Sequence, residues 1–175
     1  MKNTIWNIDP AHSEIQFKVK HLVISTVTGS FTQFTGAAEA TEDFDDAKIS
    51  FEADINSLST NNEQRDGHLK GSDFFDAEKF PKIKFSSVNF SKNGNDDFEL
   101  EGDLTIKGAT RRLKLSVTHN GIAKDPWDNV KAGFELSGKI SRKDFGLTWN
   151  TLTETGGAVV GDEVKLIASV QLVKQ

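Results

Sequence analysis

Three polar residues near the N-terminus have the side-chain types that a hydrolytic site uses. Asp9, His12 and Ser13 stand close together in the sequence, and a carboxylate, an imidazole and a hydroxyl can together generate a nucleophile. A catalytic serine on an α/β scaffold stands in a nucleophile-elbow sequence, which Ser13 lacks. We therefore predict a hydrogen-bonded structural cluster at the entrance of a strand, and no catalytic residue.

The histidines are the residues that could bind a metal. The chain has 4 histidines and no cysteine, so a zinc site would need imidazoles such as those of His12, His21 and His68. None of them forms a His-x-x-x-His pair, and we expect them at strand ends or at the opening of a cavity. The sequence predicts no metal site and no other cofactor.

Two basic residues of a short polar segment could contact the head group of an amphiphilic ligand. Arg65 and His68 are three positions apart in a predicted helix, which places them on the same face. Together with Arg142 they could bind an anionic or polar head group. The alternative is a solvated helix face on which Arg65 forms an ion pair with Glu63 or Asp66.

Alternating apolar and polar side chains predict the elements that position these residues. One run places Ala47, Ile49, Phe51, Ala53 and Ile55 on a single face, as expected for a strand with one dry side. About eight strands are predicted, near 4–8, 13–20, 27–41, 46–57, 82–90, 97–107, 110–123 and 130–142, with a final one near 162–173. The first range is short and could be an edge extension. Long one-sided strands favour a closed barrel, because closure removes exposed strand edges.

One helix is predicted over residues 61–70. Thr60 and Glu63 have the spacing of a capping box, and Gly71 stands where a left-handed residue ends a helix. The segment is too polar to be buried, so we expect it to cover one mouth of the barrel. The residues expected to point inward from this cover are Leu69, Phe74 and Phe75.

The interior of an eight-stranded barrel is either filled by side chains or hollow enough for one ligand. The chain has 13 Phe and no Tyr, which indicates an interior with few polar atoms. Small residues within the strands favour a hollow interior, although they could instead mark taper or bends in a curved sheet. These residues are Ala53, Gly102, Ala132, Gly138 and Ala168.

Length, charge and hydropathy exclude several classes of protein. The 175 residues suit a single domain over 1–175, and a net charge of -5 argues against nucleic-acid binding and against a polybasic membrane site. No apolar run approaches the roughly 20 residues of a membrane span. Because Met1–Asp9 has no apolar signal region, we expect a soluble protein, cytoplasmic as written, or periplasmic if a signal has been removed.

Several short motifs resemble those of the YceI-like family, which comprises lipocalin-like barrels described as polyisoprenoid-binding. They occur in the same order along nearly the whole chain. The motifs are WNIDPAHS (6–13), FKVKHL (17–22), VTGSF (27–31), RDGHL (65–69), FFDAEKFP (74–81), LTIKG (104–108), SRKDFGL (141–147) and VGDEV (160–164).

The resemblance implies an extended eight-stranded antiparallel barrel with a long internal tunnel. It also implies isoprenoid quinones, prenyl phosphates or fatty-acid-like amphiphiles as ligands, a possible homodimer, and often a periplasmic location. It offers no catalytic motif to transfer.

The sequence therefore predicts an all-β, lipocalin-like barrel that carries or stores a long-chain isoprenoid or similar lipid. Alternation, rather than the resemblance, selects the residues of the tunnel. The tunnel wall is predicted to include Phe17, Val19, Ile49, Phe51, Phe85, Leu104, Phe134 and Leu136, and its mouths Phe75, Phe145 and Trp149. Two alternatives remain: an enzyme of lipid or stress metabolism that uses the His12 and His68 neighbourhood, and an interaction domain with a filled interior.

Overall fold

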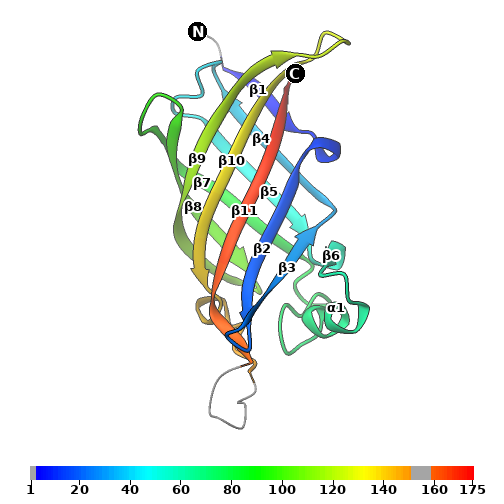
Figure 1. Cartoon of the computed structure of the whole chain (residues 1–175). Helices are drawn as coiled ribbons and strands as arrows, with labels where there is room; N and C mark the ends of the chain where they lie inside the picture. Colours follow the sequence, from blue (N-terminus) through cyan, green and yellow to red (C-terminus); the bar gives the residue numbers. More distant parts are fainter. Residues whose placement is uncertain (1–2, 151–158) are drawn as a thin grey trace.

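The computed structural model describes residues 3–150 and 159–175, and its wall is a single antiparallel sheet (Figure 1). The alternating runs of the sequence form its strands, with apolar side chains inside and polar side chains outside. The strands are β1 (Thr4–Ile8), β2 (Glu14–His21), β3 (Ser25–Phe31), β4 (Phe34–Ala40), β5 (Lys48–Asp54), β6 (Leu58–Ser59), β7 (Lys82–Lys92), β8 (Asp97–Ile106), β9 (Ala109–Lys124), β10 (Val130–Ser141) and β11 (Val160–Lys174).

The sheet closes into the predicted eight-stranded antiparallel barrel. β1 and β2 both pair with β11, β1 near the end of β11 at Leu172–Lys174 and β2 farther back. They act as one wall strand interrupted by a 3-10 turn at Pro10–His12. β3 and β4 pair with β2 and β1 in the same way, so the ring runs from this second broken strand through β5, β7, β8, β9, β10 and β11.

The sequence wrongly predicts one continuous strand over 27–41 and a strand over 46–57. The first is broken between β3 and β4, and β5 ends at Asp54 and is followed by a 3-10 turn at Ile55–Ser57. The two irregular segments bind each other: the amide of Thr32 donates to the carbonyl of Ser57, and the amide of Asp54 donates to the carbonyl of Gln33. The alternation of residues along one strand does not predict such bonds, because they join segments that are distant in the sequence.

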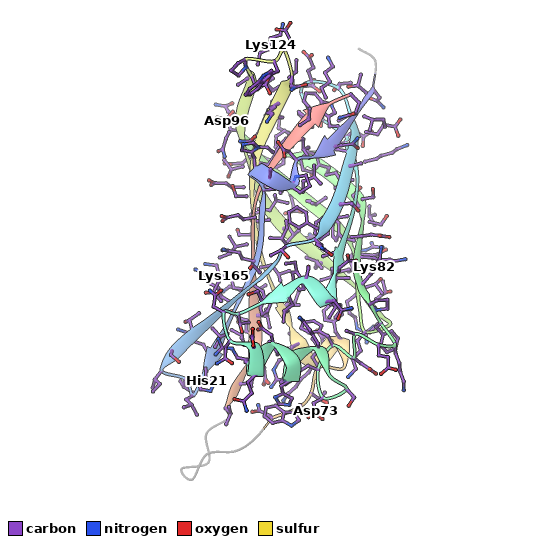
Figure 2. All side chains as sticks on the ribbon, turned by 90° about the vertical axis from the view of Figure 1, so that its right-hand side faces the viewer. His21, Asp73, Lys82, Asp96, Lys124 and Lys165 are labelled. Atoms are coloured by element: carbon purple, nitrogen blue, oxygen red, sulfur yellow. The ribbon has the colours of Figure 1, made fainter. Side chains whose placement is uncertain are left out.

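The wall is built differently at one end of the barrel. There the chain turns away from the sheet after β5 and forms the short strand β6. β6 pairs with β3, through Leu58 with Phe31. Helix α1 (Glu63–Lys70) and the following segment to Pro81 lie beside β6 at this end (Figures 1 and 2). We call it the α1 end. The helix therefore lies at one end of the barrel, and the predicted inward-pointing residues Leu69, Phe74 and Phe75 of this segment line the cavity.

The predicted caps of this helix are wrong. Asn62, not Thr60, is the N-cap, and its side chain accepts from the amide of Arg65 at 3.0 Å. Thr60 instead donates its amide to the carboxylate of Asp66 at 2.8 Å. Gly71 has φ -78° and is not left-handed, because downstream amides such as that of Ala77 already bind the last carbonyls of the helix.

Candidate ligand cavity

The barrel contains a partly open cavity of about 270 Å³ whose lining is almost wholly apolar. Inward-facing side chains from strands on all sides of the barrel reach it. The predicted tunnel residues that line it are Phe17, Val19, Ile49, Phe51, Phe75, Phe85, Leu104, Phe134 and Leu136. The cavity contradicts the alternative of an interaction domain with a filled interior.

Two of the small residues behave differently from the expectation that they leave space open. A Cβ atom at Gly102 would lie 2.4 Å from the ring of Phe85, and one at Gly138 would lie 2.3 Å from Leu115. Neighbouring side chains thus cover both glycines. Ala53 and Ala168 do line the cavity, so these two small residues, unlike Gly102 and Gly138, help to leave it hollow.

Aromatic side chains surround the α1 end of the cavity. Phe74 lines the cavity, and its ring centroid lies 5.3 Å from that of Trp149 and 5.1 Å from that of His68. The rings of His68 and Trp149 meet edge to face at 4.7 Å. Trp149 thus contacts the mouth through Phe74. Phe145, which was predicted at a mouth, is 2% exposed and belongs to the core without lining the cavity. We call Phe74, His68 and Trp149 the mouth cluster.

Arg142 lies beside this cluster and is buried, not placed at an open surface. Its Nη1 donates to the carbonyls of Leu147 at 2.6 Å and Trp149 at 2.9 Å. Its Nε donates to Gly161 at 2.8 Å, and its Nη2 to Val160 at 3.3 Å. Burial lowers the pKa of the guanidinium, and the nearby carboxylate of Asp162 partly opposes this change. The side chain also lines the cavity, and among the described lining residues it is the one that carries a charge.

Arg65 and His68 bind different partners. Arg65 donates Nε to the hydroxyl of Thr60 at 2.8 Å and Nη2 to the carbonyl of Thr60 at 2.9 Å, in place of the ion pair with Glu63 or Asp66 that was the alternative. His68 Nε2 is hydrogen-bonded to Asp73 at 3.0 Å. Of the three head-group candidates, the structure links His68 and Arg142 through Trp149 and places Arg65 against Thr60.

The opposite end of the cavity is closed by a residue that sequence reasoning missed. Phe44 lies in the turn between β4 and β5 and is 1% exposed. Its ring lines the cavity and contacts Trp6 at 4.8 Å and Phe134 at 4.9 Å between centroids. The residue falls between the predicted strands 27–41 and 46–57, so alternation did not assign it to the cavity. A single Phe among the acidic residues at 42–46 is nevertheless a usable signal.

Two buried polar atoms near Phe44 have no hydrogen-bond partner within residues 3–150 and 159–175, namely Trp6 Nε1 and His119 Nε2. The ring of His119 stacks on Phe134 at 4.6 Å. Burial lowers the pKa of His119, against the raising effects of Asp96 and of a hydrogen bond with the Gly121 backbone. This imidazole is therefore held neutral inside an aromatic cluster.

Asp9 and His12 are hydrogen-bonded to each other, but Ser13 bonds to a different strand, so the three residues form neither a triad nor the predicted single cluster. His12 Nδ1 is bonded to Asp9 Oδ2 at 2.9 Å, and Lys131 donates to the same oxygen at 3.1 Å. Burial raises the pKa of Asp9, yet the bonds from His12 and Lys131 together hold it below its ordinary value. The hydroxyl of Ser13 accepts from the amide of Gln171 at 3.0 Å, so it is held by β11.

His12 and His68 do not share a site. The turn that carries His12 lies well above α1 along the barrel in both views (Figures 1 and 2). Within the part of the chain that the structure describes, no cluster of three or more His, Asp or Glu side chains could hold a metal ion. In the same part, no helix is long and apolar enough to cross a membrane.

Comparison with known proteins agrees with this architecture. The family model of the YceI-like domain matches residues 6–172. UPF0312 protein SA2479 of Staphylococcus aureus strain N315 is 39% identical over 170 residues, which are 96% of each chain. A YCEI protein of Campylobacter jejuni is 33% identical, with a TM-score of 0.77 over 89% of this chain and 90% of that chain.

Two more distant structures share the fold. BcnA of Burkholderia cenocepacia has a TM-score of 0.80 at 22% identity, covering 94% of this chain and 98% of that chain. A polyisoprenoid binding domain of Saccharophagus degradans, implicated in plant cell wall breakdown, has a TM-score of 0.74 at 12% identity, covering 99% and 100%. The family match spans almost all of the chain, and the curated relative matches over nearly its full length, so the chain belongs to the YceI-like domain family.

Proposed function

We propose that this protein binds a long-chain isoprenoid, or a similar amphiphilic lipid, in the barrel cavity and carries or stores it without chemical change. The observation that carries the proposal is the apolar cavity of about 270 Å³ inside the barrel. Small-molecule pockets measure about 300–1,000 Å³ and hold polar groups at chosen points. This one offers an almost unbroken hydrocarbon surface, which suits a hydrocarbon tail.

The size of the binding energy favours a long tail over a small metabolite. Each buried methylene contributes roughly 0.8 kcal/mol, whereas association costs about 4–15 kcal/mol. An apolar ligand therefore needs on the order of ten or more carbons before its affinity is useful. The distant polyisoprenoid binding domain has the same fold, but at 12% identity the cavity itself is the stronger support.

For the polar end of the lipid we propose the α1 end of the cavity. Arg142 lines the cavity there, and the mouth cluster brings His68 to the same place. Arg65, which lies against Thr60, is the third proposed contact. A head group bound there would accept hydrogen bonds from these side chains, in addition to the bonds that they already make with the chain. An isoprenoid quinone, a prenyl phosphate and a fatty-acid-like lipid all have acceptor oxygens suited to such donors.

A non-catalytic role fits the arrangement of the polar residues better than the alternative enzyme does. His12 and His68 lie on separate parts of the barrel, and the hydroxyl of Ser13 is bonded to the backbone of β11. If lipid turnover nevertheless required His12, its replacement by Ala would abolish conversion of a bound lipid. We expect the His12→Ala variant to bind lipid as the wild type does.

Native mass spectrometry of the freshly purified protein, followed by lipid extraction, tests the proposal. A bound isoprenoid or long-chain amphiphile is the expected result, and the same spectra report whether the protein is a homodimer. Ala168→Phe should reduce the bound lipid by filling the cavity, since Ala168 lines it. Ser169→Phe, on the exposed face of the same strand, is the matched control. Persistently lipid-free protein that also takes up no added lipid would refute the proposal.

A further inference from the structure

At the end of the cavity opposite α1, one side chain forms the boundary. Phe44 lines the cavity, whereas Trp6 and His119, which pack against the same ring, do not. Trp6 is 0% exposed. The ring of Phe44 therefore separates the hollow part of the barrel from a packed aromatic cluster behind it.

The turn that delivers Phe44 holds it firmly. The amide of Phe44 donates to the carbonyl of Thr41 at 3.1 Å, and the carbonyl of Phe44 accepts from Ala47 at 3.3 Å. The hydroxyl of Thr41 and the amide of Asp45 both donate to the carboxylate of Asp43. Such local bonds fix the loop that folds across this end of the barrel.

The backbone of Phe44 adds an independent observation. Its φ is 59°, a left-handed conformation that bulky residues seldom adopt. Residues in such conformations persist only where their surroundings enforce them, and they cluster at ligand sites. A glycine or asparagine would adopt this backbone conformation more easily. The presence of Phe44 is therefore explained by its aromatic ring and not by the turn.

On these grounds we propose that Phe44 is a specificity-determining residue that sets the maximum tail length of the bound lipid. This inference rests on the proposed function, because it concerns the same cavity. A lipid whose head group lies at Arg142 directs its tail toward Phe44, and the tail must end or fold back where it meets that ring.

The strand that runs along the cavity gives the scale of the limit. Lining residues of β11 extend from Val160 to Leu172. Strands rise about 3.3 Å per residue and tilt by about 40° in barrels, so this distance is about 30 Å along the axis. A fully extended chain advances about 1.2 Å per bond. The length of the barrel thus sets an upper bound of about 25 chain bonds, or about six isoprene units at roughly four bonds each.

The test is a length series of polyprenyl alcohols that extends below and above this limit. Delipidated protein is mixed with each alcohol in a mild detergent, and the bound fraction is measured by native mass spectrometry. For the wild type we expect binding to rise with length and to fall at least tenfold beyond about six units. Phe44→Ala should extend the limit by about one unit, because the vacated depth is close to the 4.8 Å ring spacing, or about four chain bonds.

Two further variants keep the test decisive if Phe44→Ala folds poorly. Phe44→Leu should lengthen the limit by less, and Phe44→Trp should shorten it. The matched control is Phe98→Ala, which removes an equally buried ring that does not line the cavity and should leave the limit unchanged.

The possible outcomes separate the two proposals. A limit that moves in opposite directions in Phe44→Leu and Phe44→Trp, and not in Phe98→Ala, supports the inference. Binding without a length limit, or a limit that ignores Phe44, overturns the inference and leaves lipid binding intact. If no polyprenol and no extracted lipid binds at any length, the proposed function fails and the inference fails with it.

Discussion

Arg142 donates a hydrogen bond of 2.9 Å to the carbonyl oxygen of Trp149, so a buried cation fixes the backbone of a residue whose ring belongs to the mouth cluster. The same guanidinium binds the carbonyls of Leu147, Val160 and Gly161. It therefore joins the segment after β10 to the start of β11. Only the planar, multi-donor guanidinium can serve four carbonyl oxygens at once.

Replacing Arg142 by lysine should lower the free energy of unfolding by about 2–4 kcal/mol, because an ammonium group reaches fewer of these carbonyls and leaves the others buried without a donor. Urea denaturation followed by circular dichroism measures the loss. Lys143→Ala is the control, since Lys143 is exposed and forms an ion pair with the exposed Asp162, and it should change stability by less than about 0.5 kcal/mol. Equal stability of Arg142→Lys and wild type would contradict the role given to the guanidinium.

His119 should make the fold sensitive to mild acid. Burial holds its pKa below the ordinary value, so the unfolded chain binds the proton first as the pH falls. Stability contributed by the neutral ring is present above about pH 6.5, the pKa of an unperturbed histidine, and is lost below it. Thermal unfolding between neutral and mildly acidic pH should show a falling midpoint.

His119→Phe should remove much of this pH dependence and be neutral or stabilising at neutral pH. A phenyl ring keeps the stacking on Phe134 and leaves no unpaired nitrogen. His21→Gln, at the end of β2, is the control and should retain the wild-type slope. An unchanged slope in His119→Phe would show that another group causes the pH dependence.

Gly102→Ala should destabilise the barrel by about 1–3 kcal/mol, the usual cost of overpacking. The new methyl group would lie 2.4 Å from the ring of Phe85 and 2.6 Å from the carbonyl oxygen of Ser86. Gly133→Ala is a matched control in a neighbouring part of the sheet, because its nearest neighbour would be 3.7 Å away. Chemical denaturation of the two variants should separate them, and similar stabilities would argue against the close packing over Gly102.

Phe74→Leu should speed the release of bound lipid. The substitution keeps an apolar side chain but removes the ring contacts with His68 and Trp149. Aromatic pairs contribute about 0.5–1.5 kcal/mol each, so losing both should raise the release rate by up to about a hundredfold. Transfer of a fluorescent fatty acid to acceptor vesicles measures this rate, with Val88→Leu as a control at an exposed site far from the mouth. Unchanged release would mean that the ligand leaves by another route.

Alternation within single strands was enough to predict the barrel. Residues such as Phe51, Leu104 and Phe134 point inward because side chains in a strand alternate between faces, and this property depends only on neighbouring positions. Nine of the eleven residues that this reasoning selected for the tunnel lie on the cavity wall, which includes many more residues than were selected.

Features that depend on contacts between distant residues were decided only by the tertiary structure. Thr32 and Gln33 interrupt a wall strand because they bond to residues of the turn after β5, and Arg142 is buried because carbonyls from two separate segments surround it. Phe44 lies in what reads as a polar turn, yet it reaches Trp6 and Phe134 from other strands. Strand faces follow from local backbone geometry, whereas the position where a chain breaks, buries a charge or closes a cavity depends on partners that are adjacent only after folding.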